Sequence, residues 1–543
     1  MNQLPFYGAA AIDYSKKPAI IHGPSGKSVT YAEVDQRSIQ LARHLQAVGL
    51  KRGDRFSLFM ENHLRYPEIC WAAMRSGLLV VPVNSLMTSD EMAYIIEDSD
   101  SKLVVTSHRM RDIATSALDK LTAKDHHLLD ALMVDGVTAG WHSYEDVIDK
   151  YPVDTPKEQW QGGTMVYSSG TSGIPKGIFK QLPERLITAG PLRSEPMRSY
   201  GMDDQAIYLS TAPLYHAAPL GYCLYTQSVG GTVIIMDKFD PELSLRLVEK
   251  YGITHSQWVP TMFVRLLRLP EDVKKRYCID SLKAAIHGAG PCSIETKKAM
   301  IEWWGPVIFE YYGSSEGNGV TSISSEEWLR HPGSVGKPML GVVHICDDDG
   351  TEVTCGVEGL VYFERETVSF SYHKDQGKTI SAQHPGHENW STVGDLGKVD
   401  EDGYLYLTGR QSALIISGGV NIYPQIVENA LSSHPGVEDA VVIGVPNEEM
   451  GEEVTAVVQL SSGWAPSEDT SVALRDYLLQ KIARYMIPRS FTFLDQIPRQ
   501  PTGKLRKHDL MNAISREHEL QEMVSTNPCD AQSVSIASKI KMG

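Results

Sequence analysis

Residues 167–177 read YSSGTSGIPKG, a run of small hydroxyl residues and glycines that ends beside a single lysine. Backbone N–H groups freed by glycine, together with Ser and Thr hydroxyls, can surround an anion, and a lysine at the rim adds positive charge. The composition therefore suggests a site for nucleotide phosphates, while a flexible polar turn is an equal alternative for the stretch alone. The segment lacks the G-K-[ST] ending of a P-loop, and no GxGxxG is present.

Length and charge limit the class of protein. A chain of 543 residues is too long for one hydrophobic core, because single cores stop growing at about 250–300 residues, so two or more domains are expected. The 42% hydrophobic and 22% charged residues are ordinary for a soluble globular protein. A net charge of −16 argues against nucleic acid or an anionic membrane as a partner, since both attract clustered Lys and Arg.

The sequence carries no recognisable signal for export or membrane insertion. Its start, MNQLPFYGAAAIDYSKK, has no basic leader and does not resemble a secretory signal. The longest apolar run, GLLVVPV at residues 77–83, is far shorter than the roughly 18 residues of a membrane span. The seven cysteines are scattered and form no CxxC pair, which predicts reduced thiols, no structural zinc and a cytoplasmic location.

Hydrophobic patterns predict an α/β protein. Thr30 followed by Glu33 is typical of a capping box at the start of a helix, and Gly49 marks its end. Four apolar residues share one face of this helix: Val34, Leu41, Leu45 and Val48. Short β-rich runs then alternate with helical patterns, for example at residues 103–107, 232–236 and 360–363, which indicates α/β layering.

The pattern changes after residues 401–410, EDGYLYLTGR. A helix near 424–431, strands near 439–445 and 453–460, a helix near 470–483 and a strand near 490–494 predict a separate α+β unit of about a hundred residues. From about residue 516 the sequence is polar and without pattern, so a frayed tail is expected.

Four further segments extend the interpretation of the glycine-rich stretch. They read YYGSSEG at 311–317, STVGDLG at 391–397, TGRQSALIISGGVNIYP at 408–424 and PRQPTGKLRK at 498–507. With residues 167–177 they resemble, in order and spacing over almost the whole chain, the motifs of the adenylate-forming superfamily. That superfamily contains acyl- and aryl-CoA synthetases, nonribosomal adenylation domains and luciferases, and the resemblance is greatest to the acyl-CoA synthetases.

The resemblance implies the fold class and the domains. The implied fold is α/β, with a large N-terminal domain of two α/β subdomains plus a small β-barrel, and a small α+β C-terminal lid domain. The implied ranges are 1–410 for the N-terminal adenylate-forming (AMP-binding) domain, 411–515 for the lid and 516–543 for the polar tail. Relatives usually carry aspartate or lysine at the hinge two residues past Arg410, whereas Ser412 and Ala413 follow here, which leaves the hinge details open.

The resemblance also implies a reaction. A carboxylate attacks ATP to give an acyl-adenylate and pyrophosphate, and a thiol then displaces AMP to give a thioester. The implied cofactors are ATP, Mg²⁺ and coenzyme A, and the partners are a small-molecule carboxylic acid and CoA, with neither nucleic acid nor a transmembrane segment. A role in fatty acid metabolism is expected, while the acid, the pathway and a homodimeric state are left open.

The matched motifs imply residues for ATP. Those for the phosphates are Ser168, Ser169, Gly170, Thr171, Ser172, Gly173 and Lys176. Those for adenine and the adenylate are Gly288, Ala289, Gly290, Tyr312, Gly313 and Ser315. Glu316 matches the magnesium-associated glutamate. Asp395 matches the acceptor of both ribose hydroxyls, and Arg410 the arginine that reaches ribose and phosphate. Without the motifs, Tyr312 would be a buried structural residue, and Asp395 or Arg410 a turn residue or ion-pair partner.

Further residues are implied for catalysis, the thiol and the acid. Lys504 matches the lysine that the lid carries to the cleft for adenylation. Gly418 and Gly419 offer a wall without side chains for a narrow pantetheine arm, with a simple turn as the alternative. Expected acyl-binding residues are His216, Ala217, Ala218, Val259, Gly313 and Ser314. His216 resembles a gating, catalytic position, and a core histidine is an equal alternative.

The acyl segment also bears on the substrate. Amino-acid-activating relatives carry an aspartate near residues 213–219, and its absence disfavours an amino-acid substrate. Several small residues suggest a roomy apolar pocket, hence a medium or long acyl chain or a bulky ring system. Two other functions stay open: a stand-alone ligase that loads a carrier protein, and a catalytically silent nucleotide- or acyl-binding protein.

Overall fold

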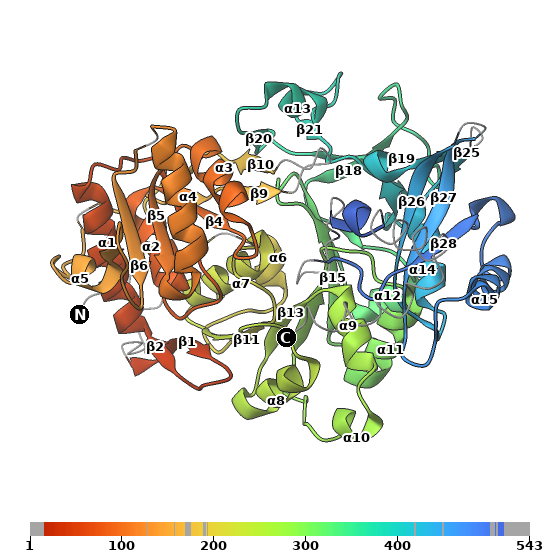
Figure 1. Cartoon of the computed structure of the whole chain (residues 1–543), viewed down its shortest axis with the longest axis horizontal. Helices are drawn as coiled ribbons and strands as arrows, with labels where there is room; N and C mark the ends of the chain where they lie inside the picture. Colours follow the sequence, from red (N-terminus) through yellow and green to blue (C-terminus); the bar gives the residue numbers. More distant parts are fainter. Residues whose placement is uncertain are drawn as a thin grey trace, which may run out of the picture. The chain divides into compact units, whose positions relative to one another are not determined.

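A computed structural model describes residues 16–125, 127–156, 158–168, 175–187, 192, 194–417, 420–447, 450–499, 505 and 509–514. The chain forms two compact units, Met1–Leu407 and Thr408–Gly543. Figure 1 shows the two units by the colour of their elements, from red to blue along the sequence. The predicted domain boundary after residue 410 stays a prediction.

Unit 1 contains a six-stranded parallel sheet of order β7-β6-β5-β3-β4-β8. Its strands are β3 (Arg55–Phe59), β4 (Leu79–Val83), β5 (Ser101–Ser107), β6 (Asp130–Val134), β7 (His142–Ser143) and β8 (Gly163–Thr164). Its helices are α1 (Tyr31–Ala47), α2 (Tyr66–Ser76), α3 (Ser89–Asp98), α4 (Arg111–Ala123) and α5 (Tyr144–Ile148). Successive strand residues pack alternately with α1 and α2 on one face and with α3 and α4 on the other, so both faces are covered.

The first helix confirms the capping prediction. The Thr30 hydroxyl accepts from the Glu33 backbone N–H at 3.3 Å, and the Thr30 N–H donates to the Glu33 carboxylate at 2.7 Å. Val34, Leu41 and Leu45 are buried, and Gly49 follows the helix with φ +101°. Here local capping, apolar spacing and burial agree.

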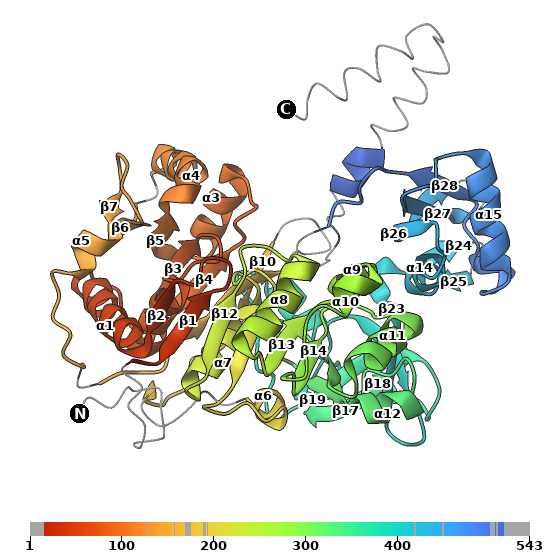
Figure 2. The same ribbon diagram turned by 90° about the horizontal axis from the view of Figure 1, so that it is seen from below.

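A nine-stranded sheet forms the second layer of unit 1, in the order β17-β16-β15-β14-β13-β11-β12-β1-β2. Its strands are β1 (Pro18–His22), β2 (Ser28–Thr30), β11 (Ile207–Ser210), β12 (Thr232–Ile235), β13 (His255–Trp258), β14 (Ala284–His287), β15 (Ile308–Gly313), β16 (Val320–Ile323) and β17 (Lys337–Leu340). Helix α7 (Ala217–Ser228) shares a core with α1 and α2, between the two sheets. Helices α8 (Pro241–Tyr251), α9 (Pro260–Leu267) and α11 (Ile294–Trp304) pack on the opposite face, as Figure 2 shows in yellow and green.

Two small sheets complete unit 1. One contains β9 (Val166–Ser168), β10 (Lys176–Phe179) and β20 (Ser371–Tyr372). The other contains β18 (Val342–Cys346), β19 (Gly359–Glu364), β21 (Trp390–Ser391), β22 (Asp395–Val399) and β23 (Leu405–Arg410), whose last three residues belong to unit 2. Short helices α6 (Glu195–Ser199), α10 (Glu271–Lys274), α12 (Ser325–Arg330) and α13 (Gln376–Ser381) connect the strands.

Unit 2 is an α+β fold around a five-stranded sheet. The sheet contains β24 (Ile415–Ser417), β25 (Val420–Ile422), β26 (Val437–Asn447), β27 (Gly451–Leu460) and β28 (Ser490–Phe493). Helices α14 (Pro424–Ser432) and α15 (Glu468–Leu479) pack on one face through Val427, Leu431, Leu474 and Leu478. The predicted elements of this region are all present, but the helix expected at 470–483 starts and ends earlier. Ser467 caps its N-terminus, and the 3₁₀ turn η5 (Arg484–Met486) follows.

Two further predictions from the sequence concern a membrane-spanning helix and the C-terminal tail. No helix within the described ranges combines the length and apolarity that a membrane crossing needs. The tail predicted from residue 516 lies outside the described residues.

Candidate active site

Four parallel strands of the large sheet carry most of the predicted site residues of unit 1 at one edge. Strands β11, β13, β14 and β15 are mutually parallel neighbours, so their carboxyl ends lie at the same edge of the sheet. Val259 directly follows β13 and Gly288 directly follows β14, while Gly313 ends β15. In open α/β sheets, ligands bind outside the carboxyl ends of the strands. The topology therefore places the predicted adenine and acyl segments together.

The segment HGAGP is held close to strand β15. A Cβ built on Gly288 would lie 2.7 Å from the Tyr311 carbonyl oxygen, so only glycine permits this approach. The next residue, Ala289, has φ +66°, an uncommon value for a residue other than glycine. A strained backbone beside a strand end is a common feature of binding sites.

Two predicted ATP residues are in direct contact. The Tyr312 hydroxyl donates to Asp395 Oδ2 at 2.6 Å, although 83 residues separate them. Asp395 is the first residue of β22 and is 5% exposed, and the ring of Tyr312 lies 6.1 Å from that of Phe363. The residues predicted to contact adenine and ribose thus form one pair.

Asn318 connects the same two motifs a second time. The Ser314 hydroxyl donates to Asn318 Oδ1 at 2.8 Å, and Asn318 Nδ2 donates to the Ser391 carbonyl at 3.3 Å. Asn318 is 2% exposed, so both bonds lie away from solvent. The loop after β15 is therefore fixed against strand β21, just before β22, by the side chain of Asn318, which the sequence interpretation did not select.

Glu316 is buried and oriented by a tyrosine. The Tyr372 hydroxyl donates to Glu316 Oε1 at 2.8 Å, and the carboxylate residue is 8% exposed. Across the described ranges, no cluster of three or more His, Cys, Asp or Glu side chains could hold a metal ion by itself. A single buried carboxylate fits Mg²⁺, which proteins usually hold through one or two carboxylates together with substrate phosphates. Glu316 would hold such an ion, which would supply positive charge to offset the negative charge of the phosphates.

Strands β9 and β10, which form the stem on either side of the glycine-rich stretch, are connected to Glu316 through the pairing of β10 with β20. Strands β9 and β10 form an antiparallel pair in which Ser168 faces Lys176. Strand β10 also pairs with β20, where Ile178 faces Tyr372, the hydroxyl donor to Glu316. Ser169, Gly170, Thr171, Ser172 and Gly173 lie outside the described residues.

Lys176 is positioned by an aspartate. Its Nζ lies 3.1 Å from Asp375 Oδ2. The hydrogen bond to Asp375 raises the pKa of Lys176, so the side chain remains charged at neutral pH.

Three cations near Glu316 were missed by the sequence interpretation. Lys180 Nζ lies 2.8 Å from a Cβ built on Gly317, and Arg365 Nη1 donates to the Gly317 carbonyl at 3.2 Å. Lys378 Nζ lies 4.1 Å from the centre of the Tyr372 ring. Burial lowers the pKa of both Lys180 and Lys378, and the negative charge of Glu316 opposes this shift. An excess of positive charge around one carboxylate is suited to a polyphosphate.

Four of the six predicted acyl residues lie at helix starts. His216 and Val259 are the N-cap residues of α7 and α9, and the His216 ring lies 4.4 Å from that of Tyr215. Ala217 packs toward β9 and β10, and Ala218 packs toward the core between the two sheets.

Tyrosines follow these alanines on α7. Tyr222, one turn after Ala218, has its ring 5.8 Å from that of Tyr208 and 6.4 Å from that of Tyr311. Aromatic rings therefore bound the region beyond Ala218, which the small residues alone did not indicate.

Four further predicted residues belong to unit 2. Arg410 ends β23 and is exposed. Gly418, Gly419 and Lys504 lie outside the described residues, so their roles stay predictions.

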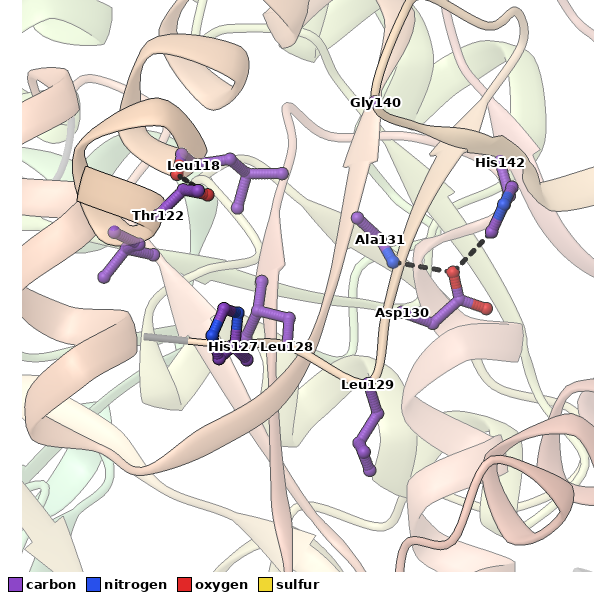
Figure 3. Close-up of a pocket in the computed structure, with 10 residues that line it drawn as sticks. Leu118, Thr122, His127, Leu128, Leu129, Asp130, Ala131, Gly140 and His142 are labelled. Carbon is purple, nitrogen blue, oxygen red and sulfur yellow. Dashed lines mark hydrogen bonds and ion pairs between the residues drawn. The ribbon is translucent and has the colours of Figure 1, made fainter. Parts of the chain in front are cut away.

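A cavity of about 310 Å³ lies elsewhere in unit 1, beside α4 and β6. Figure 3 shows His142 Nδ1 and the Ala131 N–H both bonded to Asp130 Oδ1, with Leu118 and His127 on the other side. None of the residues selected from the sequence lines this cavity.

Comparison with known proteins identifies the family. Residues 9–373 match the AMP-binding enzyme family and residues 426–504 match the AMP-binding enzyme C-terminal domain. The chain belongs to this family of adenylate-forming enzymes, which confirms the resemblance and the predicted fold class. The adenylate-forming CoA ligases among its relatives use ATP, Mg²⁺ and coenzyme A.

Three relatives illustrate the range of the family. A feruloyl-CoA synthase of Amycolatopsis sp is 31% identical over 496 residues, covering 91% of this chain and 95% of its own. A fatty acid–[acyl-carrier-protein] ligase, ScoC of Streptomyces coeruleorubidus, is 30% identical over 499 residues, covering 89% and 91%. The structure of ATP-bound MatB from Rhodopseudomonas palustris aligns with a TM-score of 0.76 at 27% identity. The alignment covers 94% of this chain and 99% of the MatB chain.

Proposed function

We propose that the chain is an ATP-dependent acyl-CoA synthetase that converts a carboxylic acid into a CoA thioester through an acyl-adenylate. The observation that carries this proposal is the connection of the motifs within unit 1. Tyr312 bonds to Asp395, and Glu316 bonds to Tyr372 beside the stem of the glycine-rich stretch. Sites for a nucleoside and for its phosphates would then be adjacent, at the edge of the sheet where ligands of α/β folds bind.

The first step would form the adenylate. A carboxylate oxygen of the acid bonds to the α-phosphorus of ATP, and the bond from that phosphorus to the bridging oxygen breaks, releasing pyrophosphate. Charge develops on the phosphates, so fixed positive groups would stabilise the transition state. We assign this role to Lys176, Lys180 and Lys504, with Arg410 on the ribose and α-phosphate.

The second step would form the thioester. The sulfur of CoA, losing its proton, bonds to the carbonyl carbon, and AMP leaves with the oxygen that came from the acid. We assign the pantetheine path to Gly418 and Gly419, and the change between steps to movement of a lid, residues 411–515, about a hinge after Arg410. The scattered cysteines support a reducing, cytoplasmic setting.

For the acid, we propose a medium or long acyl chain or a bulky apolar ring system. Support comes from Ala217 and Ala218 at the start of α7, and from the lack of an acidic side chain in residues 213–219. The tyrosine rings that follow on the same helix would suit an acid with a ring or an occasional hydroxyl.

A second candidate function is the loading of a carrier protein. The observation that favours it is the 30% identity to ScoC, a fatty acid–[acyl-carrier-protein] ligase, over most of both chains. The chemistry of the first step would be the same, and the acceptor of the acyl group alone would differ.

The acceptor of the acyl group separates the two enzymatic functions, and pyrophosphate release separates both from a silent protein. A panel of carboxylic acids would be tested with ATP and Mg²⁺, with CoA or a phosphopantetheinylated carrier protein as acceptor, and thioesters would be identified by mass. An acyl-CoA synthetase gives acyl-CoA and AMP. Transfer to the carrier protein alone supports the second candidate, and binding of ATP without pyrophosphate exchange for any acid would indicate a catalytically silent protein.

A further inference from the structure

Helix α3 contacts the glycine-rich stretch, residues 167–177, at two places. Near the start of the stretch, the Tyr167 hydroxyl donates to Asp98 Oδ2 at 2.7 Å. Near its end, the Tyr94 hydroxyl donates to the Pro175 carbonyl at 3.1 Å. Tyr94 and Asp98 are four residues apart, so they lie on the same face of α3. One helix face therefore holds the chain on both sides of most of the residues predicted to bind phosphate.

Glycine in the neighbouring strand leaves room for the Tyr167 ring. Tyr167 on β9 faces Gly177 on β10, and a Cβ built on Gly177 would lie 3.0 Å from Tyr167 Cζ and 3.1 Å from its hydroxyl oxygen. A side chain at residue 177 would therefore press on the ring. Burial and the hydrogen bond to Asp98 raise the pKa of Tyr167, so its hydroxyl keeps its proton and remains a donor at neutral pH.

The end of α3 also holds the segment that positions Lys176. Lys374 Nζ donates to the Asp98 carbonyl at 2.8 Å and to Asp100 Oδ1 at 2.7 Å. The next residue, Asp375, pairs with Lys176 at 3.1 Å. A carboxylate in the last turn of a helix is unfavourable because that end of the helix is itself negative, and the Lys374 ammonium offsets this charge. The helix end is thus connected to both ends of the stretch and to the partner of its lysine.

We propose that Tyr94 and Asp98 are positioning residues for the phosphate site. Each holds one end of the stretch, so together they would set the separation of the two ends and the place of Lys176, which directly follows Pro175. Groups whose positions are fixed in advance bind phosphate better, because ordering a free loop on binding costs affinity. The inference rests on the proposed function, which assigns this stretch to the phosphates of ATP.

The alternative is that the two hydrogen bonds serve only the stability of unit 1. Both tyrosine rings pack at the edge of a core that includes Met92, Ile95 and Ile96 of α3, so such a role is available to them. The two roles differ in the ligand that detects them. AMP lacks the β- and γ-phosphates, so a positioning role would weaken the binding of ATP and spare that of AMP. A purely structural role would affect both nucleotides equally or neither.

Calorimetry with the full chain and Mg²⁺ would compare the two nucleotides. Tyr94→Phe and Tyr167→Phe should each raise the Kd for ATP about three- to tenfold and leave the Kd for AMP within about twofold. Asp98→Ala should act in the same way, and Asp98→Asn should lose less, because its amide oxygen can still accept from the hydroxyl. Tyr277→Phe is the matched control, since its hydroxyl donates to Glu242 Oε1 at 2.8 Å outside every motif, and it should bind both nucleotides normally.

Thermal melting checks that each variant folds. Should Asp98→Ala unfold, the two phenylalanine variants decide the question, because they keep every carbon atom of the side chain. An unchanged Kd for ATP in both of them would overturn the inference, as would equal losses for ATP and AMP. Absence of pyrophosphate release by the unaltered protein with every acid of the panel would instead count against the proposed function, while the two Kd values would still decide the inference.

Discussion

Replacing Tyr312 by phenylalanine removes one hydroxyl and keeps the ring that is proposed to pack against adenine. That hydroxyl donates to Asp395 Oδ2 at 2.6 Å, and Asp395 is 5% exposed, so water replaces the lost bond poorly. A hydrogen bond to a charged group contributes roughly 1.5–3 kcal/mol, here to the orientation of Asp395. Each 1.4 kcal/mol is about tenfold in affinity, so loss of this orientation should raise the Kd for ATP by at most roughly 10- to 150-fold.

The assay is direct binding of ATP by calorimetry, with the KM for ATP in pyrophosphate exchange as a second readout. Tyr406→Phe is the matched control, because its hydroxyl donates to Asp400 Oδ2 at 3.0 Å in the same unit but outside every motif. We expect the control to bind ATP normally. An ATP Kd for Tyr312→Phe equal to that of the unaltered protein would refute the assignment of this pair to the nucleoside.

Four further predictions concern other parts of the site. Lys180→Met should lower the rate of pyrophosphate exchange about 10- to 100-fold while leaving the melting temperature equal or higher, because a partly desolvated ammonium is removed; a normal rate would exclude Lys180 from the phosphate site. Ala218→Trp should exclude bulky acids and spare short ones in a pyrophosphate-release screen, whereas equal losses would place the acyl site elsewhere. Lys504→Ala should remove most adenylation and spare thioester formation from a supplied acyl-adenylate, and Gly419→Leu should do the reverse; equal effects on both half-reactions would contradict the two roles of the lid. Burial holds the pKa of His287 well below its usual value, so its contribution to the free energy of unfolding should be complete above about pH 6.5 and should fall below that pH by up to about 1.4 kcal/mol per pH unit. His287→Gln should therefore reduce the change in melting temperature between about pH 7 and pH 5.

Local sequence patterns predicted the helices and strands that are defined by residues close together in the sequence. The Thr30–Glu33 capping box and the apolar face of the helix define α1. The β-rich run at 103–107 lies in β5, and the run at 232–236 lies in β12 except for its last residue. The end of α15 was predicted less well, because the apolar pattern continues past Leu479 into residues of the 3₁₀ turn Arg484–Met486. Such boundaries depend on tertiary packing as much as on residue type.

The contacts between the motifs could not be predicted from spacing. Tyr372 follows Glu316 by 56 residues and Asp395 follows Tyr312 by 83, and only the pairing of β10 with β20 and the folding of β22 bring them together. Lys180 did have a signal, since a strand that starts at Lys176 places residues 176, 178 and 180 on one face. Extending the strand beyond the motif would have found this second lysine.

The transfer of oxygen tests the central claim most directly. With the best acid from the screen labelled with ¹⁸O in its carboxylate, ATP and CoA would be added and the products analysed by mass. The proposed reaction predicts acyl-CoA together with AMP that carries one ¹⁸O atom, because the oxygen that bonds to the α-phosphorus leaves with AMP. Label recovered in inorganic phosphate with formation of ADP, or AMP without label, would contradict an acyl-adenylate intermediate.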